Sequence, residues 1–129
     1  MKPKTYSNES GLTLIEVTLV VAVLLGLISV LFLGVAAYKK GSSRASCILN
    51  MTTMQKAVRS YANLYQLDVG DTISKMQLVG PDKMIETEPV CPAEGVYTYN
   101  ATIPPVGSVF LTCEINGMED HKPNSTTGW

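Results

Sequence analysis

"LTLIEVTLVVAVLLGLISVLFLGVAAY", residues 12–38, is an apolar run from which the organisation of the whole chain can be inferred. Its last 22 positions, 17–38, carry no charged side chain, and their only polar side chains are Thr18, Ser29 and Tyr38. As an α-helix that rises about 1.5 Å per residue, these positions cover roughly 33 Å, which matches the hydrocarbon core of a bilayer. We therefore predict a membrane-spanning helix over residues 12–38.

A secretory signal peptide is the alternative interpretation of this run. Such a peptide has a shorter apolar region followed by a small-residue cleavage site, which "GVAAYKK" resembles only loosely at Ala36 and Ala37. The whole chain has 129 residues, which leaves room for one small domain beside the helix. Its 10 basic and 11 acidic side chains give a net charge of −1, without the basic excess of a nucleic-acid surface. We therefore predict no nucleic-acid partner.

Beyond the apolar run, the spacing of apolar side chains by fours and threes predicts that the helix continues. One face of the predicted amphipathic half, residues 39–67, carries Cys47, Met51, Met54, Val58, Tyr61 and Tyr65. No proline interrupts the pattern. We expect a single helix from about Leu12 to Leu67, roughly 80 Å long.

The remaining residues predict a small globular head over 68–122 and a flexible tail over 123–129. A short second helix is expected between Asp71 or Thr72, as its cap, and the stop at Gly80 and Pro81. Two β-like runs at 96–100 and 108–115, separated by a turn-rich segment, predict an antiparallel hairpin. The expected fold is α+β, with a long N-terminal helix packed on this head.

Glu16 stands at the beginning of the apolar run, where a charge is costly. An acidic side chain at the centre of a bilayer costs about 2.5–3.5 kcal/mol, and less near the edge. Thr13, three residues earlier, makes a capping box with Glu16, which explains a helix start but not a carboxylate in lipid. Gly11, then Leu12, "TLIEV" and some twenty apolar residues resemble the prepilin cleavage and methylation signature of type IV pilins and type II secretion pseudopilins.

This resemblance implies that prepilin peptidase removes a leader, residues 1–11, by cutting between Gly11 and Leu12 on the cytoplasmic side. Leu12 would become the N-methylated terminus, and its amine would neutralise Glu16 of a neighbouring subunit during assembly. The implied function is a structural subunit, anchored in the inner membrane with its head in the periplasm, which polymerises with other pilin subunits into a pilus or pseudopilus. Leu12 replaces the family's usual phenylalanine, and the usual proline within the helix is missing, which leaves Gly26 or Gly34 as sites for any kink.

Outside the cytoplasm, the three cysteines would lie in a disulfide-permissive compartment. Cys91 precedes the first expected strand and Cys113 lies late in the second, so we predict that they pair across the hairpin. Closing that loop would contribute about 3–4 kcal/mol in the chain-entropy model. Cys47, on the apolar helical face, is expected to be a buried free thiol. "CPAEGVYTY" and the later Cys113 also resemble small pilin-like proteins that end in such a hairpin.

A zinc site of Cys91, Cys113 and His121, with or without Cys47, is the alternative for these cysteines, but the absence of a C-x-x-C spacing argues against it. We therefore predict no metal site and no cofactor. No nucleophile with a base, carboxylate pair or phosphate loop is recognisable, so we predict no catalytic residue and no enzyme. The second function that the sequence allows is a single-pass, membrane-anchored periplasmic binding or regulatory module, which needs neither Glu16 nor cleavage at Gly11.

Overall fold

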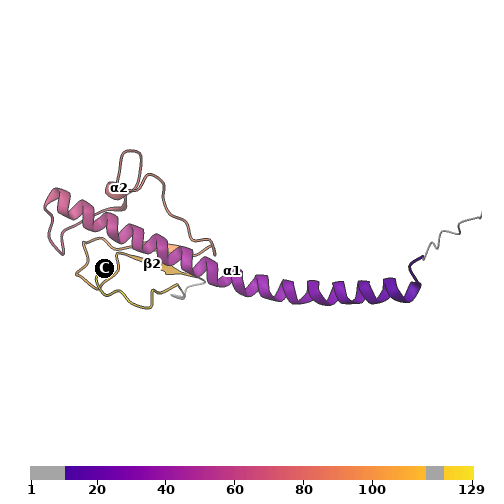
Figure 1. The fold of residues 1–129 in the computed structure, drawn as a ribbon. Helices are drawn as coiled ribbons and strands as arrows, with labels where there is room; N and C mark the ends of the chain where they lie inside the picture. Colours follow the sequence, from indigo (N-terminus) through magenta and orange to yellow (C-terminus); the bar gives the residue numbers. More distant parts are fainter. Residues whose placement is uncertain (1–10, 116–120) are drawn as a thin grey trace, which may run out of the picture. The chain divides into compact units, whose positions relative to one another are not determined.

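The computed structural model describes residues 11–115 and 121–129. A long helix, α1 (Leu14–Tyr65), is followed by a short helix, α2 (Lys75–Leu78), and by two strands, β1 (Val96–Tyr99) and β2 (Leu111–Glu114) (Figure 1). The strands form a two-stranded antiparallel sheet. The long N-terminal apolar helix and the small C-terminal part with its short helix and sheet are consistent with the predicted α+β class.

The chain divides between Tyr38 and Lys39 into two compact units, and α1 contributes to both. In the first unit the helix runs without interruption through Gly26 and Gly34. Every described residue of this unit, 11–38, is exposed in the single chain. By length and composition, α1 is able to cross a membrane. The predicted leader, apart from Gly11, lies outside the described residues.

The C-terminal end of α1 is closed by a left-handed residue. Gln66, just after the helix, has a φ of 54°, and the N–H of Leu67 donates a 2.9 Å hydrogen bond to the carbonyl of Ala62. This bond, over five residues, is the wider of the two bonds in a Schellman motif, which usually has glycine at the left-handed position. The helix thus ends two residues before the predicted Leu67, and with glutamine where glycine is preferred.

The core of the second unit is built on the C-terminal half of α1. Four positions of the predicted apolar face are buried, namely Cys47, Met51, Met54 and Val58. The next position of the predicted face, Tyr61, is partly buried and packs against this core, whereas Tyr65 is 58% exposed, so the buried face ends before Tyr65. The helix instead buries three residues that the pattern did not include, namely Gln55, Ala57 and Ala62.

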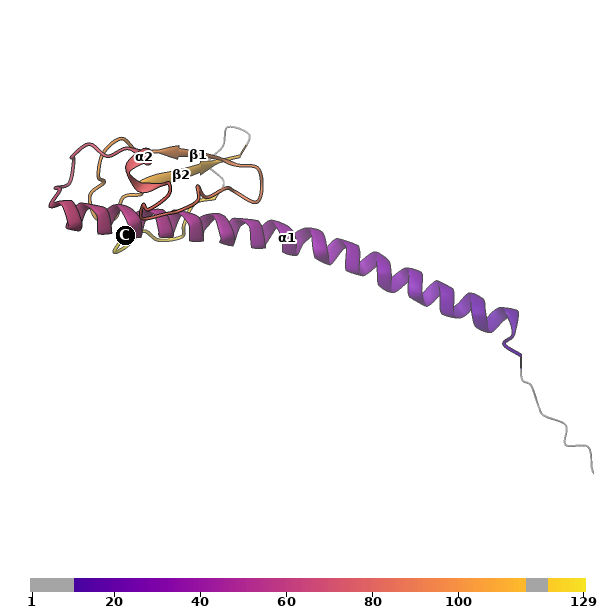
Figure 2. The ribbon, with the colours of Figure 1, turned by 90° about the horizontal axis from the view of Figure 1, so that it is seen from above.

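Loop and strand residues complete this core from the other side. Figure 2 shows α2 and both strands alongside the C-terminal half of α1. The residues that they and the connecting loops contribute to the buried cluster are Ile73, Leu78, Cys91, Ile103, Phe110, Leu111 and Cys113. Burial of these side chains against α1 supplies most of the driving force for folding the second unit.

Helix α2 is one turn long, and its cap differs from the prediction. Ser74 precedes the helix, and its backbone N–H donates a 2.7 Å hydrogen bond to the side-chain Oε1 of Gln77. The predicted cap at Asp71 or Thr72 is therefore wrong. Thr72 pairs instead with Thr102 in an isolated antiparallel bridge, which keeps its backbone extended.

The two strands pair in the antiparallel arrangement that the sequence predicts, with Tyr97 opposite Cys113 and Tyr99 opposite Leu111. Both strands are shorter than the predicted runs. Just beyond the paired residues, the N–H of Asn100, after β1, donates to the carbonyl of Phe110, before β2, over 2.8 Å. Cys113 points into the core from β2, where alternate residues are buried.

The segment after residue 120 contacts the rest of the second unit. Arg44 of α1 donates to the backbone oxygen of Lys122 at 3.1 Å and to Oδ1 of Asn124 at 3.3 Å. Arg59 donates to the backbone oxygen of Trp129 at 3.1 Å. The contacts of Asn124 and Trp129 were not predicted from the sequence. The flexibility of residues 123–129 stays a prediction.

Candidate functional site

The predicted processing motif lies at the beginning of α1. Gly11 and Leu12 precede the helix, and Leu12 is 74% exposed. The N–H of Glu16 donates to Oγ1 of Thr13 at 3.3 Å, and the N–H of Thr13 points to Oε2 of Glu16 at 3.5 Å. This reciprocal pair is the geometry of the predicted capping box. It holds the Glu16 carboxylate at the same end of the helix as Leu12.

Among the described residues 11–38, Glu16 carries the only charged side chain. The large apolar side chains around and after it are exposed in the isolated chain, for example Leu14 at 84% and Leu33 at 77%. An exposed apolar surface of this length is typical of segments that lipid or other protein chains cover. Whatever covers the helix there also surrounds Glu16.

A second cluster of chemically active side chains lies in the core of the second unit. It consists of Cys47 on α1, Cys91 before β1, Cys113 on β2 and His121, and all four are buried. Their three Sγ atoms and a ring nitrogen of His121 lie within 4.8 Å of one another. Nδ1 of His121 is 3.6 Å from Sγ of Cys91 and 3.9 Å from Sγ of Cys113. These four residues are a group that can hold a metal ion.

The three cysteines are free thiols in the structure. Cys91 and Cys113, the predicted disulfide pair, are neighbours without being bonded, so their pairing stays a prediction. Cys47, predicted to be a buried free thiol, is fully buried and free but is adjacent to the other two. These three sulfurs and His121 are the residues of the alternative zinc site, which the absence of a C-x-x-C spacing had argued against.

The thiols of the cluster differ in acidity. Burial raises the pKa of the Cys47 thiol, and burial together with the hydrogen bonds that the Cys113 thiol donates to the sulfurs of Cys47 and Cys91 raises the pKa of Cys113. Burial acts to raise the pKa of Cys91, but hydrogen bonds that its sulfur accepts from the backbone N–H groups of Ala93 and Gly95 and from the thiols of Cys113 and Cys47 together lower that pKa. Cys91 is therefore the sulfur best prepared to carry negative charge.

The turn after Cys91 packs closely against the sulfur atoms of Cys91 and Cys113. The N–H of Glu94 donates to the carbonyl of Cys91 at 3.1 Å, and Glu94 has a φ of 59°. A Cβ atom on Gly95 would lie 2.7 Å from Sγ of Cys113 and 3.1 Å from Sγ of Cys91. A real Cβ does not approach a sulfur so closely, so the position requires glycine. The pattern "CPAEG" thus has a structural role that its resemblance to pilin-like hairpins did not explain.

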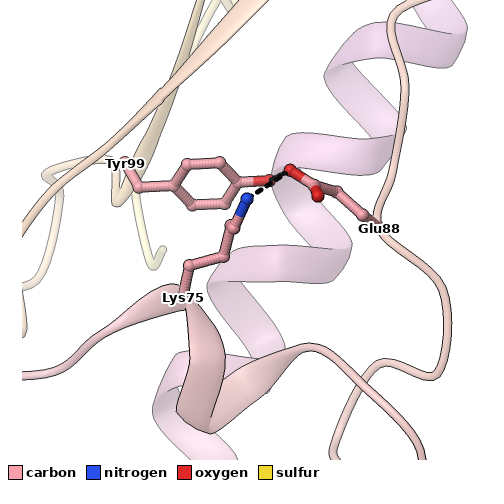
Figure 3. Close-up of polar contacts among 3 residues, drawn as sticks. All are labelled: Lys75, Glu88 and Tyr99. Carbon is pink, nitrogen blue, oxygen red and sulfur yellow. Dashed lines mark hydrogen bonds and ion pairs between the residues drawn. The ribbon is translucent and has the colours of Figure 1, made fainter.

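A polar contact ties α2 to the sheet at the surface (Figure 3). Nζ of Lys75 lies 2.9 Å from Oε1 of Glu88, and the hydroxyl of Tyr99 donates to the same oxygen at 3.3 Å. The Lys75 ammonium holds the pKa of Glu88 below its usual value. Both charged side chains are more than 40% exposed, so solvent screens the pair and it contributes little to stability.

The second unit also has a surface hollow of about 430 Å³ between α1 and the C-terminal residues, with Lys56, Arg59 and Trp129 in its lining. Two cationic side chains and an aromatic ring are suited to an anionic or aromatic ligand. The sequence did not predict this hollow, because Trp129 was expected in a flexible tail.

The chain matches no protein-family model, no curated protein and no solved structure. The resemblance to pilins and pseudopilins is thus neither supported nor opposed by these comparisons.

Proposed function

We propose that this protein is a structural subunit, a pilin or pseudopilin, that polymerises through the N-terminal half of α1. The observation that carries the proposal is the position of Glu16, the only charged side chain in residues 11–38, whose apolar helix surface is exposed in the single chain. A plain membrane anchor needs no carboxylate there. In a helix that packs against neighbouring helices at one axial offset, such a carboxylate can select that offset.

Cleavage between Gly11 and Leu12 would create a new α-amine close to the capping box of Thr13 and Glu16. An α-amine has a pKa of about 7.7–8.0 and is mostly cationic at neutral pH, and N-methylation leaves this charge in place. Each processed chain would then carry a cation and an anion at the same end of its helix. Two chains with the correct axial offset bring the amine of one to the Glu16 of the other.

The energetics favour this offset over others. Burying a carboxylate among apolar side chains is costly without a partner and much less so with one. Offsets that leave Glu16 unpaired are therefore disfavoured, as a single buried polar residue disfavours incorrect registers in a coiled coil. In this proposal Glu16 determines register, and the apolar surface from residue 17 to 38 provides the attraction.

The proposal implies a location and a set of partners. The precursor would span the inner membrane once, with its leader in the cytoplasm, where prepilin peptidase acts, and with its second unit in the periplasm. The mature chain would then join other pilin or pseudopilin subunits in a type IV pilus or a type II secretion pseudopilus. No catalytic activity is assigned to it.

The second candidate function is a membrane-anchored periplasmic binding or regulatory module. The hollow between Lys56, Arg59 and Trp129 is the observation that favours it. In that case α1 is only an anchor, residues 1–11 remain attached, and Glu16 has no role beyond capping the helix.

Mass spectrometry of the amino terminus distinguishes the two functions. The chain is purified from membranes of its native host, digested, and its N-terminal peptide is sequenced. A peptide that begins with N-methylated Leu12 supports the structural subunit. A peptide that still contains Met1 and Gly11 refutes it and supports the plain anchor.

A further inference from the structure

The four buried ligand residues, Cys47, Cys91, Cys113 and His121, come from four separate places in the sequence. Only folding of the second unit brings them together, and none of the four is exposed to solvent by more than 4%. Soft thiol and imidazole ligands gathered in a dry core are the donor set that zinc sites use. The cluster has the four ligands of a closed structural site.

The distances fit a tetrahedral ion. Zinc lies about 2.3 Å from sulfur and about 2.0–2.1 Å from imidazole nitrogen, so ligands on a tetrahedron are about 3.8 Å apart for two sulfurs and about 3.6 Å apart for sulfur and nitrogen. Nδ1 of His121 lies 3.6 Å from Sγ of Cys91 and 3.9 Å from Sγ of Cys113, and all ligand atoms lie within 4.8 Å. We propose that Cys47, Cys91, Cys113 and His121 bind one structural Zn²⁺ ion.

The protons released and the charge left by zinc binding can be accounted for. Each of the three thiols gives up its proton to solvent, His121 binds through Nδ1 as neutral imidazole, and Zn²⁺ with three thiolates leaves a net charge of −1. The backbone N–H groups of Ala93 and Gly95 donate to the sulfur of Cys91 and stabilise this charge. Gly95, without a Cβ, is the residue that lets the turn approach the sulfurs so closely.

A disulfide between Cys91 and Cys113 explains the cluster less completely. It would use two of the four ligands and would leave the Cys47 thiol and the His121 ring buried beside it without a role. A zinc ion uses all four. It would also join α1, which carries Cys47, to β2, which carries Cys113, and a small core gains much of its stability from such a link. This role does not depend on whether the chain polymerises.

The test uses the full chain, purified in detergent and reconstituted with Zn²⁺ or Co²⁺ under reducing conditions, after which excess metal is removed. Zinc is counted by elemental mass spectrometry. The expected result is one zinc ion per chain. The cobalt form should show the intense visible bands of a tetrahedral ion together with near-ultraviolet charge transfer from thiolate. This spectrum is recorded on the unmodified chain, so it does not depend on any variant.

Variants test the ligand assignment. Cys113→Ser and His121→Ala should each lose the stoichiometric zinc, whereas Met54→Leu, a buried control on α1, should keep it. If a ligand variant does not fold, the cobalt spectrum of the unmodified chain still decides the question. Full zinc binding by both folded ligand variants would overturn the assignment.

A thiol count on chain purified without reductant, then denatured, separates zinc from the disulfide. A zinc-bound chain should show three reactive thiols. One reactive thiol, together with a linked peptide pair containing Cys91 and Cys113, would overturn the proposal, as would three thiols in a chain that binds less than half an equivalent of zinc after reconstitution.

Discussion

The side chain of Gln55 on α1 forms two hydrogen bonds with the backbone just before β2. Its Oε1 accepts from the N–H of Phe110 at 2.8 Å, and its Nε2 donates to the carbonyl of Ser108 at 3.0 Å. Gln55 is 3% exposed, so neither bond is easily replaced by water. A single amide thus aligns the start of β2 against the helix.

Replacing Gln55 by Leu should therefore destabilise the second unit. The buried N–H of Phe110 would lose its partner, at a cost of about 1–3 kcal/mol in the free energy of unfolding. Denaturant unfolding of the chain in detergent, followed by near-ultraviolet circular dichroism, measures this. Asn63→Leu, an exposed change on the same helix, should shift the free energy by less than about 0.5 kcal/mol. Equal stabilities of the two variants would show that the Gln55 bonds contribute nothing.

Gly95→Ala should also be destabilising, because the new Cβ would lie 2.7 Å from Sγ of Cys113. Overpacking of this kind costs about 1–3 kcal/mol. The matched control is Gly41→Ala on α1, where a Cβ meets nothing within 4 Å and should stabilise the helix by about 0.5–1 kcal/mol. Thermal unfolding of both variants decides, and a Gly95→Ala chain as stable as the unchanged protein would contradict the tight packing of the turn.

Gln66→Gly should stabilise the chain. Gln66 has a φ of 54°, a conformation that costs a side-chain-bearing residue about 1–2 kcal/mol, and part of the gain is lost to the greater freedom of glycine when unfolded. We expect a net gain of about 0.5–1 kcal/mol. Ala45→Gly within α1 is the control and should cost about 1 kcal/mol. Loss of stability in both variants would contradict the left-handed end of α1.

Stability should fall at alkaline pH through Tyr99. Burial, the nearby charge of Glu88 and its hydrogen bond raise the pKa of Tyr99 from 10.0 to about 12. A folded pKa above the unfolded value means that this contribution is fully present below pH 10 and is lost as the pH rises toward 12. Tyr99→Phe should show a shallower loss over that interval when unfolding free energies are compared pH by pH. Identical slopes would refute the role of Tyr99.

The long helix could be predicted because its information is local. A membrane-length apolar run and the spacing from Cys47 to Val58 are both visible in consecutive residues, and helix periodicity converts them directly into structure. The cap of α2 could not be predicted, since Asp71, Thr72 and Ser74 are all good caps. A distant pairing of Thr72 with Thr102 selects Ser74.

For the same reason, local sequence pattern could not show that the three cysteines and His121 form one buried cluster. Zinc sites are recognised in sequence by closely spaced ligand pairs, and here Cys47, Cys91, Cys113 and His121 are each several residues or more apart. Their meeting depends on the packing of α1 against β2. The predicted pair of Cys91 and Cys113 contains two members of the cluster, and the full set of four was considered only as an alternative zinc site, which the missing C-x-x-C spacing argued against.

The most direct test of the proposed subunit is the effect of Glu16 on assembly. Glu16→Ala and Glu16→Gln are expressed in the native host, and processed chain is quantified both in membranes and in filaments sheared from the cells or, for a pseudopilus, enriched by overexpression. Breaking a buried charge pair costs several kcal/mol, so we expect normal cleavage after Gly11 but at least about a tenfold loss from filaments. Ser29→Ala, a polar deletion on the same helix, should assemble normally. Filament yields from Glu16→Ala equal to those of the unchanged chain would contradict the pairing of Glu16 with a neighbour's amine.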